Sequence, residues 1–335
     1  MTSALAYWST GPYRGEIREE TLPDPTEGEV RVETLYSALS IGTERLVAAG
    51  LVPESEHERM RCPFQEGSFP FPVKYGYCNV GRVTGGVSAL HGKTVFSLFP
   101  HQDRFNIPAA MVRVLPERLP PRNAVLAANM ETALNGIWDS GAAPGDRVQV
   151  IGAGIVGLLV AWLANRIPGT DVRIDDTDPL RLEAARSIGI EPGEAGEADI
   201  VFNCSGSEAG LVRALDLAGL EGTIVEMSWH GARMVSLPLG GAFHSRRLRI
   251  IGSQVGRIPA NRAARWDLTR RMNKALTLLC DFSLDRPFSA ECDLRALPDA
   301  VAALALGRNH KIIQRIRYDE RHRDAIDRPD KGGSP

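Results

Sequence analysis

The chain has few cysteines and no paired cysteine motif. Its 335 residues include five cysteines that lie far apart and never form C-x-x-C: Cys62, Cys78, Cys204, Cys280 and Cys292. An odd number of scattered cysteines argues against a disulfide framework and against a four-cysteine zinc site, and it favours a reducing compartment. We therefore expect a cytoplasmic protein.

The chain also has little net charge, no leader pattern and no long uninterrupted apolar segment. A formal net charge of −2 gives no indication of binding to nucleic acid or to an anionic membrane. Residues 1–20 lack a basic stretch followed by an apolar core, so no signal peptide is expected. The most apolar run, 148–164, contains three glycines and predicts a strand, a turn and a helix rather than a membrane span.

The remaining pattern suits two domains of ordinary size. The first 117 residues read as short alternating strands separated by turn residues, with a proline-rich loop at 50–72 that we interpret as a lid or mobile excursion. From about 118 to 256 a helix at 124–141 is followed by apolar strands that alternate with helices, which predicts a doubly wound parallel sheet. Residues 260–281 predict one amphipathic helix, and the charged tail at 319–335 predicts disorder.

The strongest motif is VQVIGAGIVGLL, in which Gly152, Gly154 and Gly157 form G-x-G-x-x-G between a strand and a helix. The first glycine permits a tight turn, the second lets the backbone approach a pyrophosphate, and the third lets helix and strand pack closely. The free N–H groups of the helix N-terminus attract phosphate. The turn and the start of the helix, Gly152, Ala153, Gly154, Ile155, Val156 and Gly157, are therefore candidate dinucleotide ligands.

An acidic residue follows the next strand at the distance expected for a ribose-binding carboxylate. Asp176 is the first choice and Asp175 the second. A carboxylate there accepts ribose hydroxyls and repels a 2′-phosphate, which favours NAD. Arg173 and Arg181 nearby keep NADP open as an alternative.

The order of these features resembles the medium-chain dehydrogenase/reductase, or alcohol dehydrogenase, superfamily. The resemblance covers nearly all of residues 1–318 and rests on ETALNGIWDSGAAPGDRVQVIGAGIVGLL, DDTDPLRLEAARSIGI and LRIIGSQVG. It implies a GroES-like β-barrel catalytic domain at 1–117, a Rossmann domain at 118–256, and a return segment at 257–318. SALSIGTERLVAAG at 37–50 and G-Y-x-x-x-G-x-V at 76–83 resemble most the branch of the bacteriochlorophyllide hydroxyethyl dehydrogenases.

The resemblance also implies a catalytic site without zinc. The three positions that would carry zinc ligands are Ile41, Tyr77 and Ala128, none of which is a usual ligand of this metal. A displaced metal site built from Cys78, Glu44, His101 and Glu131 remains an alternative, although its spacing matches no familiar ligand pattern.

Proton handling would then fall to side chains alone. Thr43 matches the family position whose hydroxyl contacts the substrate oxygen, and Tyr77 either donates from the vacated ligand position or fills it. Glu44 matches an outer acid that orients a neighbour or pairs with Arg45 or Arg82. His101 and Glu131 are further candidates: His101 either borders the cleft or is a satisfied histidine, and Glu131 either faces the nicotinamide or complements a helix N-terminus.

Four further segments bear on ligands. In the family the turn containing Cys204, Ser205 and Gly206 lies against the adenosine and ribose, and Ser228, Trp229 and His230 lie on the nicotinamide side. Lys311 matches a basic position for the pyrophosphate. The eight arginines between 246 and 271 fit an anionic substrate, a solvated helix face or a subunit contact.

Three functions remain open. The first is zinc-independent, NAD(P)-dependent interconversion of an alcohol and a ketone. The second is NAD(P)H-dependent reduction of an activated C=C bond, and the third is a non-catalytic dinucleotide-binding protein. The family resemblance suggests a homodimer acting on a small molecule.

Overall fold

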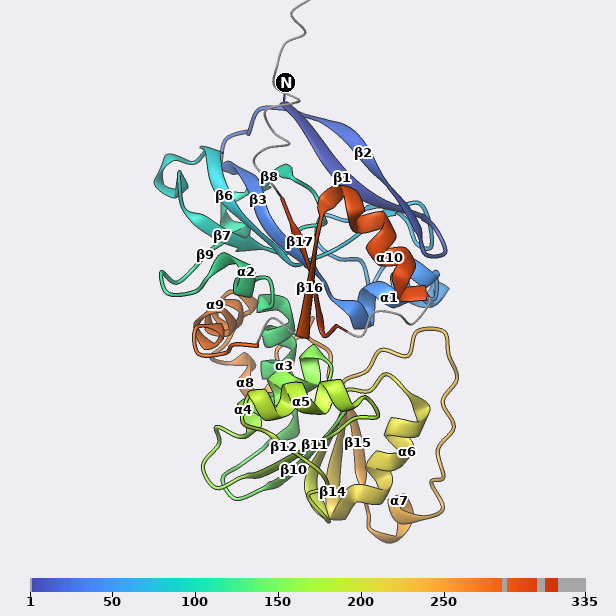
Figure 1. Ribbon diagram of the computed structural model, residues 1–335. Coiled ribbons are helices and arrows are strands. Elements are labelled where there is room, and N and C mark those ends of the chain that lie inside the picture. Colours follow the sequence, from blue (N-terminus) through green and yellow to red (C-terminus); the bar gives the residue numbers. More distant parts are fainter. Residues whose placement is uncertain (1, 285–287, 306–310, 319–335) are drawn as a thin grey trace, which may run out of the picture.

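The computed structural model describes residues 2–284, 288–305 and 311–318. The predicted tail at 319–335 lies outside the described residues. Figure 1 shows two units stacked one above the other, an antiparallel unit at the top and a parallel-sheet unit below.

The antiparallel unit consists of two sheets. The smaller sheet has the strand order β2-β1-β5-β4. Its strands are β1 (Thr2–Gly11), β2 (Arg14–Leu22), β4 (Glu66–Gly67) and β5 (Val73–Lys74). The loop at 50–72, predicted as a long excursion, contains only a short 3-10 turn and β4, and it returns to this sheet.

The larger sheet has the order β16-β17-β3-β6-β7-β9, and a further strand pairs with β3. Its members are β3 (Glu29–Leu39), β6 (Asn79–Gly86), β7 (Thr94–Ser97), β8 (Arg104–Pro108), β9 (Arg113–Val114), β16 (Ser289–Asp293) and β17 (Ile313–Arg317). β17 pairs antiparallel with β3, so the end of the described chain completes a sheet that the beginning started. Two helices pack beside it, α1 (Ile41–Ala49) and α10 (Leu297–Ala305).

The second unit is a six-stranded parallel sheet in the order β12-β11-β10-β13-β14-β15. Its strands are β10 (Arg147–Ile151), β11 (Asp171–Asp175), β12 (Glu191–Pro192), β13 (Ala198–Asn203), β14 (Ala218–Glu226) and β15 (Arg249–Gly252). In chain order this is 3-2-1-4-5-6, the doubly wound order of dinucleotide-binding sheets.

Apolar side chains cover both faces of this sheet. Along β13, Ile200 and Phe202 enter one core cluster, whereas Val201 between them enters another. Helices α4 (Ile155–Ala164) and α5 (Pro179–Ser187) contribute to the first cluster, and α6 (Glu208–Leu217) and α7 (Ala242–Ser245) to the second. The continuous apolar strands of the sequence are explained by this burial on two sides.

Helix α3 (Ala127–Ser140) joins the two units. It packs on α4 and on α9 (Leu268–Leu279), and it follows the single turn α2 (Pro121–Ala124). The first core cluster continues through α2 and α3 into Val80 and Phe96 of the antiparallel unit. The two units therefore share one apolar core.

Two predicted helices are shorter than expected. The helix expected at 124–141 begins only at Ala127, as α3, and the helix expected at 260–281 is divided into α8 (Ala260–Ala263) and α9. This division occurs because Asp267 is extended and its Oδ1 accepts the backbone N–H of Arg270 at 2.7 Å, which starts a new helix.

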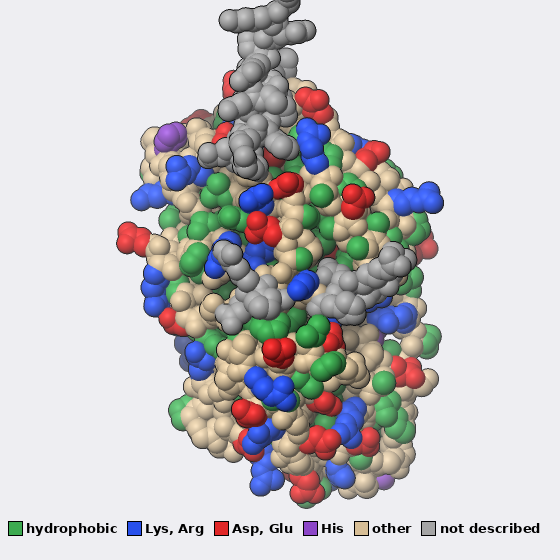
Figure 2. All heavy atoms as spheres, in the orientation of Figure 1, with side chains coloured by type: hydrophobic (Ala, Val, Ile, Leu, Met, Phe, Trp, Pro, Cys, Tyr) green, Lys and Arg blue, Asp and Glu red, His purple; other side chains and the backbone are tan. Residues whose placement is uncertain are grey.

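The helices of the described chain give no candidate for a membrane span, because none combines sufficient length with sufficient apolar character. On the face shown in Figure 2, basic and acidic side chains are interspersed.

Candidate functional site

The glycine-rich turn has the geometry that its three glycines predict. Gly152, directly after β10, has φ +96°, which favours glycine. A Cβ on Gly157 would lie 1.8 Å from the carbonyl oxygen of Gly152, so only glycine fits there. A Cβ on Gly154 would meet nothing within 4 Å. The backbone at Gly154, which begins α4, is therefore open to a ligand.

Asp176 joins this turn to the end of β11. Its Oδ2 accepts the backbone N–H of Ala153 at 2.7 Å, and its Oδ1 accepts that of Asp178 at 2.9 Å. Arg181 Nη1 lies 3.5 Å from the same Oδ2. Asp175 ends β11 itself. The first choice for the ribose carboxylate is thus fixed beside the glycine turn.

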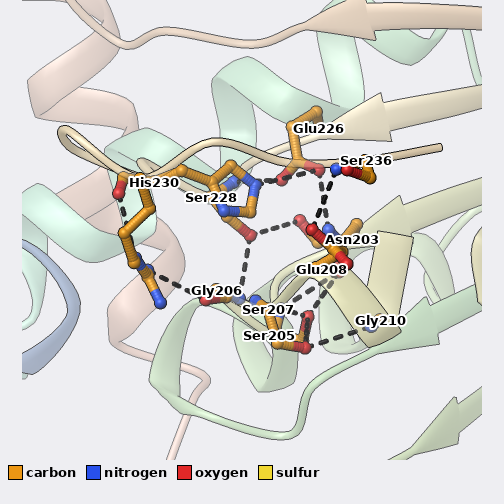
Figure 3. Close-up of polar contacts among 11 residues, drawn as sticks. Asn203, Ser205, Gly206, Ser207, Glu208, Gly210, Glu226, Ser228, His230 and Ser236 are labelled. Carbon is orange, nitrogen blue, oxygen red and sulfur yellow. Dashed lines mark hydrogen bonds and ion pairs between the residues drawn. The ribbon is translucent and has the colours of Figure 1, made fainter. Parts of the chain in front are cut away.

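The turn after β13 lies between the glycine turn and the end of β14. A Cβ on Gly152 would meet backbone atoms of Cys204 and Ser205 at 2.7 Å. On the other side, Ser228 Oγ accepts the backbone N–H of Gly206 at 3.0 Å (Figure 3). The predicted ligand residues of 204–206 and 228 are therefore brought together at the carboxyl edge of the sheet.

Two residues that sequence reasoning missed hold this edge together. Asn203 Nδ2 donates to Glu226 Oε2 at 2.7 Å, and Glu226 Oε1 accepts the backbone N–H of Ser228 at 2.7 Å (Figure 3). Both residues end apolar strands, where the carboxyl-end rule for parallel sheets indicates ligand contacts.

A polar cluster surrounds Tyr77 in the antiparallel unit, at one of the positions where the family resemblance expects a zinc ligand. The Tyr77 phenol lies near the side chains of Ser40 and Thr43, which lower its pKa, but burial, followed by nearby Cys78 and Glu44, raises this pKa well above the usual value. Asn129 Nδ2 on α3 donates to Ser40 Oγ at 3.1 Å. Thr43 and Tyr77 are thus in contact, and Ser40 and Asn129 join them. Ser40 was detectable as the N-cap residue before α1, but Asn129 had no local signal.

Glu44 contacts His101 and not Arg45 or Arg82, so of the two alternatives the structure agrees with an acid that orients a neighbour. His101 Nε2 lies 2.8 Å from Glu44 Oε2, and Glu44 Oε1 accepts the backbone N–H of Ser40 at 2.7 Å. The pair is buried, with His101 only 1% exposed. The fold thereby brings His101, which is 57 positions from Glu44 in the sequence, to the start of α1. His101 is the satisfied histidine of the two alternatives.

The His101 ring continues this chain of contacts into β3 and the last strand. Its Nδ1 lies 2.8 Å from Ser37 Oγ, which lies 2.9 Å from Tyr318 Oη. Gly76 allows the ring its place, because a Cβ there would lie 2.9 Å from His101 Cδ2. The network holds Ser40, and through it the Tyr77–Thr43 cluster, to the centre of the large sheet.

Glu131 is used in a buried ion pair between α3 and α9. Its Oε1 accepts from Arg271 Nε at 3.0 Å, and burial raises the pKa of its carboxyl although Arg271 opposes this. Arg271, 1% exposed, also donates to Asn135 and to the carbonyl of Val255. Glu131 lies in the second turn of α3, so it does not complement the helix N-terminus as one reading expected. A contact between Glu131 and nicotinamide stays a prediction, because Arg271 already binds this carboxylate.

The residues at the three former ligand positions do not fit a zinc ion. Ile41 begins α1, Ala128 lies in the first turn of α3, and Tyr77 lies near Ser40 and Thr43. Within residues 2–284, 288–305 and 311–318, no three His, Cys, Asp or Glu side chains gather as a metal would require. The alternative set that included Glu131 is not assembled, because Arg271 binds this carboxylate elsewhere.

The last two candidates for cofactor contacts, Trp229 and Lys311, lie in different surroundings. Trp229 packs, together with Tyr77, on an apolar cluster of the antiparallel unit that includes Val47 and Tyr75. Lys311 is exposed. Its contact with a pyrophosphate stays a prediction.

The arginine-rich segment is largely occupied by contacts within the protein. Arg246 donates to two backbone carbonyls, Arg247 pairs with Glu221, and Arg271 with Glu131. Arg262 and Arg270 lie over tryptophan rings. These contacts favour the structural interpretation of the segment.

We expect the five cysteines to differ widely in reactivity. Burial raises the pKa of Cys62 to about 12 and that of Cys292 to about 11, and it also raises the pKa of Cys78 and Cys204. Because the thiolate is the reactive form, half-buried Cys280 should be alkylated first in the native protein at pH 8. Peptide mapping after timed alkylation measures the order. Equal labelling of Cys78 and Cys280 would contradict it.

Comparison with known proteins agrees with this architecture. No protein-family model matches the chain. An uncharacterised zinc-type alcohol dehydrogenase-like protein of Haemophilus influenzae is 26% identical over 168 residues, which are 45% of this chain and 48% of that protein. The chain thus matches about half the length of this curated relative.

Solved structures match nearly the whole chain. Acetophenone reductase of Geotrichum candidum in complex with NAD has a TM-score of 0.74 and 14% identity, covering 94% of this chain and 97% of that one. L-idonate 5-dehydrogenase of Escherichia coli has a TM-score of 0.76 and 15% identity, covering 94% and 98%. These likenesses confirm the predicted fold class, a Rossmann sheet with a GroES-like antiparallel unit, which is the fold of the medium-chain dehydrogenases.

Proposed function

We propose that the protein is an NAD(P)-dependent oxidoreductase that interconverts an alcohol and a ketone without zinc. The observation that carries the proposal is the glycine turn, which is closed at Gly157 and open at Gly154, with Asp176 fixed beside it. A bound nicotinamide would supply the hydride chemistry. Structural neighbours include a protein solved with NAD, which agrees with this choice of cofactor.

The chain's own residues would bind the cofactor and handle the proton. The backbone at Gly154 would hold the pyrophosphate, and Asp176 would accept ribose hydroxyls, which favours NAD. Arg181, 3.5 Å from Asp176, keeps NADP open. Thr43 and Tyr77 would bond the substrate oxygen, and Tyr77 would remain a neutral donor because burial raises its pKa.

Zinc independence is supported by the residues at the former ligand positions. Ile41 and Ala128 offer no ligand atom, and Tyr77 is engaged by Ser40 and Thr43. We also propose that the substrate is a small molecule and that the enzyme is cytoplasmic. An anionic substrate receives little support from the arginine-rich segment, since five of its eight arginines have partners within the protein. A homodimer is proposed through β15, the strand at one end of the parallel sheet.

Replacing Thr43 by alanine or Tyr77 by phenylalanine tests the proposal. Each change should lower kcat by roughly 100-fold, the usual effect of losing a positioned proton donor. NADH affinity, measured by fluorescence titration, should stay within about twofold, because neither residue belongs to the glycine turn. Thr277→Ala, at an exposed position of α9, is the matched control. Unchanged turnover in both variants would remove the assignment of these residues.

A second candidate is the reduction of an activated C=C bond. A neutral phenol at Tyr77, already paired with Thr43, is a suitable donor to a substrate carbonyl. A panel of ketones and enones with NADH and NADPH separates the two activities. Tight NADH binding without turnover of any compound would instead favour a non-catalytic protein.

A further inference from the structure

Tyr7 has a buried hydroxyl that bonds no group of the described chain. The residue is 4% exposed, and its Oη is shielded from outside solvent and has no hydrogen-bond partner among the described residues. The Ser9 hydroxyl lies close to it but does not have the geometry of a hydrogen bond. Burying a hydroxyl in this way is destabilising, because the hydrogen bond that it makes to water in the unfolded chain is not replaced.

Packing holds the Tyr7 side chain in place. It extends from β1 into an apolar cluster that includes Ala48 of α1 and Leu304 of α10. Gly15 of β2 lies so close to the ring that a Cβ there would overlap the phenol. Burial is the main cause that raises the pKa of Tyr7 to about 12, so the phenol keeps its proton at neutral pH and can donate a hydrogen bond.

A small cavity lies next to Tyr7, where α1 and α10 pack beside the β1–β2 hairpin (Figure 1). The space open to the centre of a water molecule is about 10 Å³, which is the size that holds one water. Its polar lining consists of Tyr7, Ser9, Glu44 and Tyr75, and apolar residues of α1 and α10 close it. All four polar residues are buried, with between 4% and 7% of their surface exposed. The cavity therefore combines room for one small ligand with several polar groups.

Glu44 brings a negative charge to this lining. Its Oε1 accepts the backbone N–H of Ser40 at 2.7 Å, and its Oε2 lies 2.8 Å from His101 Nε2. Because an ionised carboxylate only accepts hydrogen bonds, His101 donates from Nε2. The two oxygens of a carboxylate can accept about four hydrogen bonds, so these contacts leave lone pairs for another donor. A further donor stabilises a buried charge of this kind.

We propose that the cavity binds one water molecule that joins Tyr7 to Glu44. Tyr7 Oη donates to the water oxygen, and the water donates to the Glu44 carboxylate and to the hydroxyl of Ser9 or Tyr75. These bonds give the water about three partners, the usual number for a buried water. The water connects β1 to the start of α1, because Glu44 also holds the Ser40 N–H there.

A crystal structure of the full-length protein tests the site directly. An ordered water should lie within about 3.2 Å of both Tyr7 Oη and a Glu44 carboxylate oxygen. Tyr7→Phe should lose or displace this water, whereas Tyr36→Phe, which removes a hydroxyl of β3 that does not line the cavity, should retain it. The proposal is overturned by a cavity without an ordered water, by a water that Tyr7→Phe leaves unmoved, or by an atom held within about 2.4 Å of these oxygens, as a metal ion would be.

The sign of a stability change gives a second test that needs no crystal. If Tyr7 Oη is bonded to a water, Tyr7→Phe removes a hydrogen bond and should lower the midpoint of urea unfolding by roughly 0.3 M. If the hydroxyl has no partner, the same change removes an unsatisfied group and should raise the midpoint. Tyr36→Phe is again the control and should shift the midpoint by less than about 0.1 M.

A midpoint that rises or stays unchanged in Tyr7→Phe would overturn the proposal. Neither experiment involves the cofactor or turnover, so both results are independent of the proposed function.

Discussion

Replacing Gly157 by alanine is expected to abolish NADH binding and to destabilise the protein. The new Cβ would lie 1.8 Å from the Gly152 carbonyl oxygen, and this contact is to backbone that no side-chain rotation can relieve. The turn and the start of α4 must therefore separate. Overpacking of this kind costs about 1–3 kcal/mol and displaces the N–H groups that would bind phosphate. Urea denaturation and NADH fluorescence titration measure the two effects.

Gly154→Ala is the matched variant that separates folding from binding. Its Cβ would meet nothing within 4 Å, and its φ of −70° suits alanine, so the free energy of unfolding should change by less than about 0.5 kcal/mol. NADH affinity should nevertheless fall at least tenfold, because the methyl group would occupy the space a pyrophosphate needs. Normal NADH binding by both glycine variants would refute the assignment of this turn as the dinucleotide site.

Replacing Arg271 by leucine is expected to give the largest loss of stability among single side-chain changes. The guanidinium is buried and bonds Glu131, Asn135 and the carbonyl of Val255. Its removal leaves a carboxylate without its partner in a buried site, which typically costs 3–5 kcal/mol. Because the Val255 carbonyl belongs to the loop after β15, that edge of the sheet should loosen as well. Urea denaturation at pH 7 gives the free energy of unfolding.

Two further variants make this result interpretable. Arg118→Ala breaks the exposed pair with Asp281 and should cost less than about 1 kcal/mol. Replacing Arg271 and Glu131 together by leucine should recover part of the loss, since an apolar pair avoids the isolated charge. If Arg271→Leu costs no more than Arg118→Ala, the buried pair is not the structural link that we describe.

The geometry of the candidate dinucleotide turn was predictable because its signals are local. Gly152, Gly154 and Gly157 are five positions apart at most, and the turn that they form needs only the strand before and the helix after. Asp176 follows the next strand, and parallel pairing brings the two strand ends together in fixed register. A residue at the end of one strand therefore meets the turn after its neighbour.

The candidate catalytic cluster depends on contacts that the sequence records only in part. Thr43 and Tyr77 were named from the family resemblance, and they are in contact. Their supporting residues were missed because the contacts are long in sequence: Asn129 is 89 positions from Ser40, and Tyr318 is 281 positions from Ser37. No periodicity or spacing records such a pairing. For Glu131 a local signal was misleading. Its acidic side chain suggested a role at a helix start, but Arg271 of α9 binds it instead.

By itself the sequence determined where the parallel sheet and its glycine turn lie, because strand and turn preferences act over a few neighbouring residues. It also supplied Ile41, Tyr77 and Ala128 at the positions where the family resemblance expects zinc ligands, and residue identity decides which atoms can bind a metal. Only the tertiary structure decided that Glu44 pairs with His101, that Asn129 reaches Ser40, and that the His230 ring lies beside Glu226. These contacts depend on how the large sheet, α3 and the loop after β14 pack together. Packing brings together residues that are far apart in the sequence, and their spacing does not predict the contact.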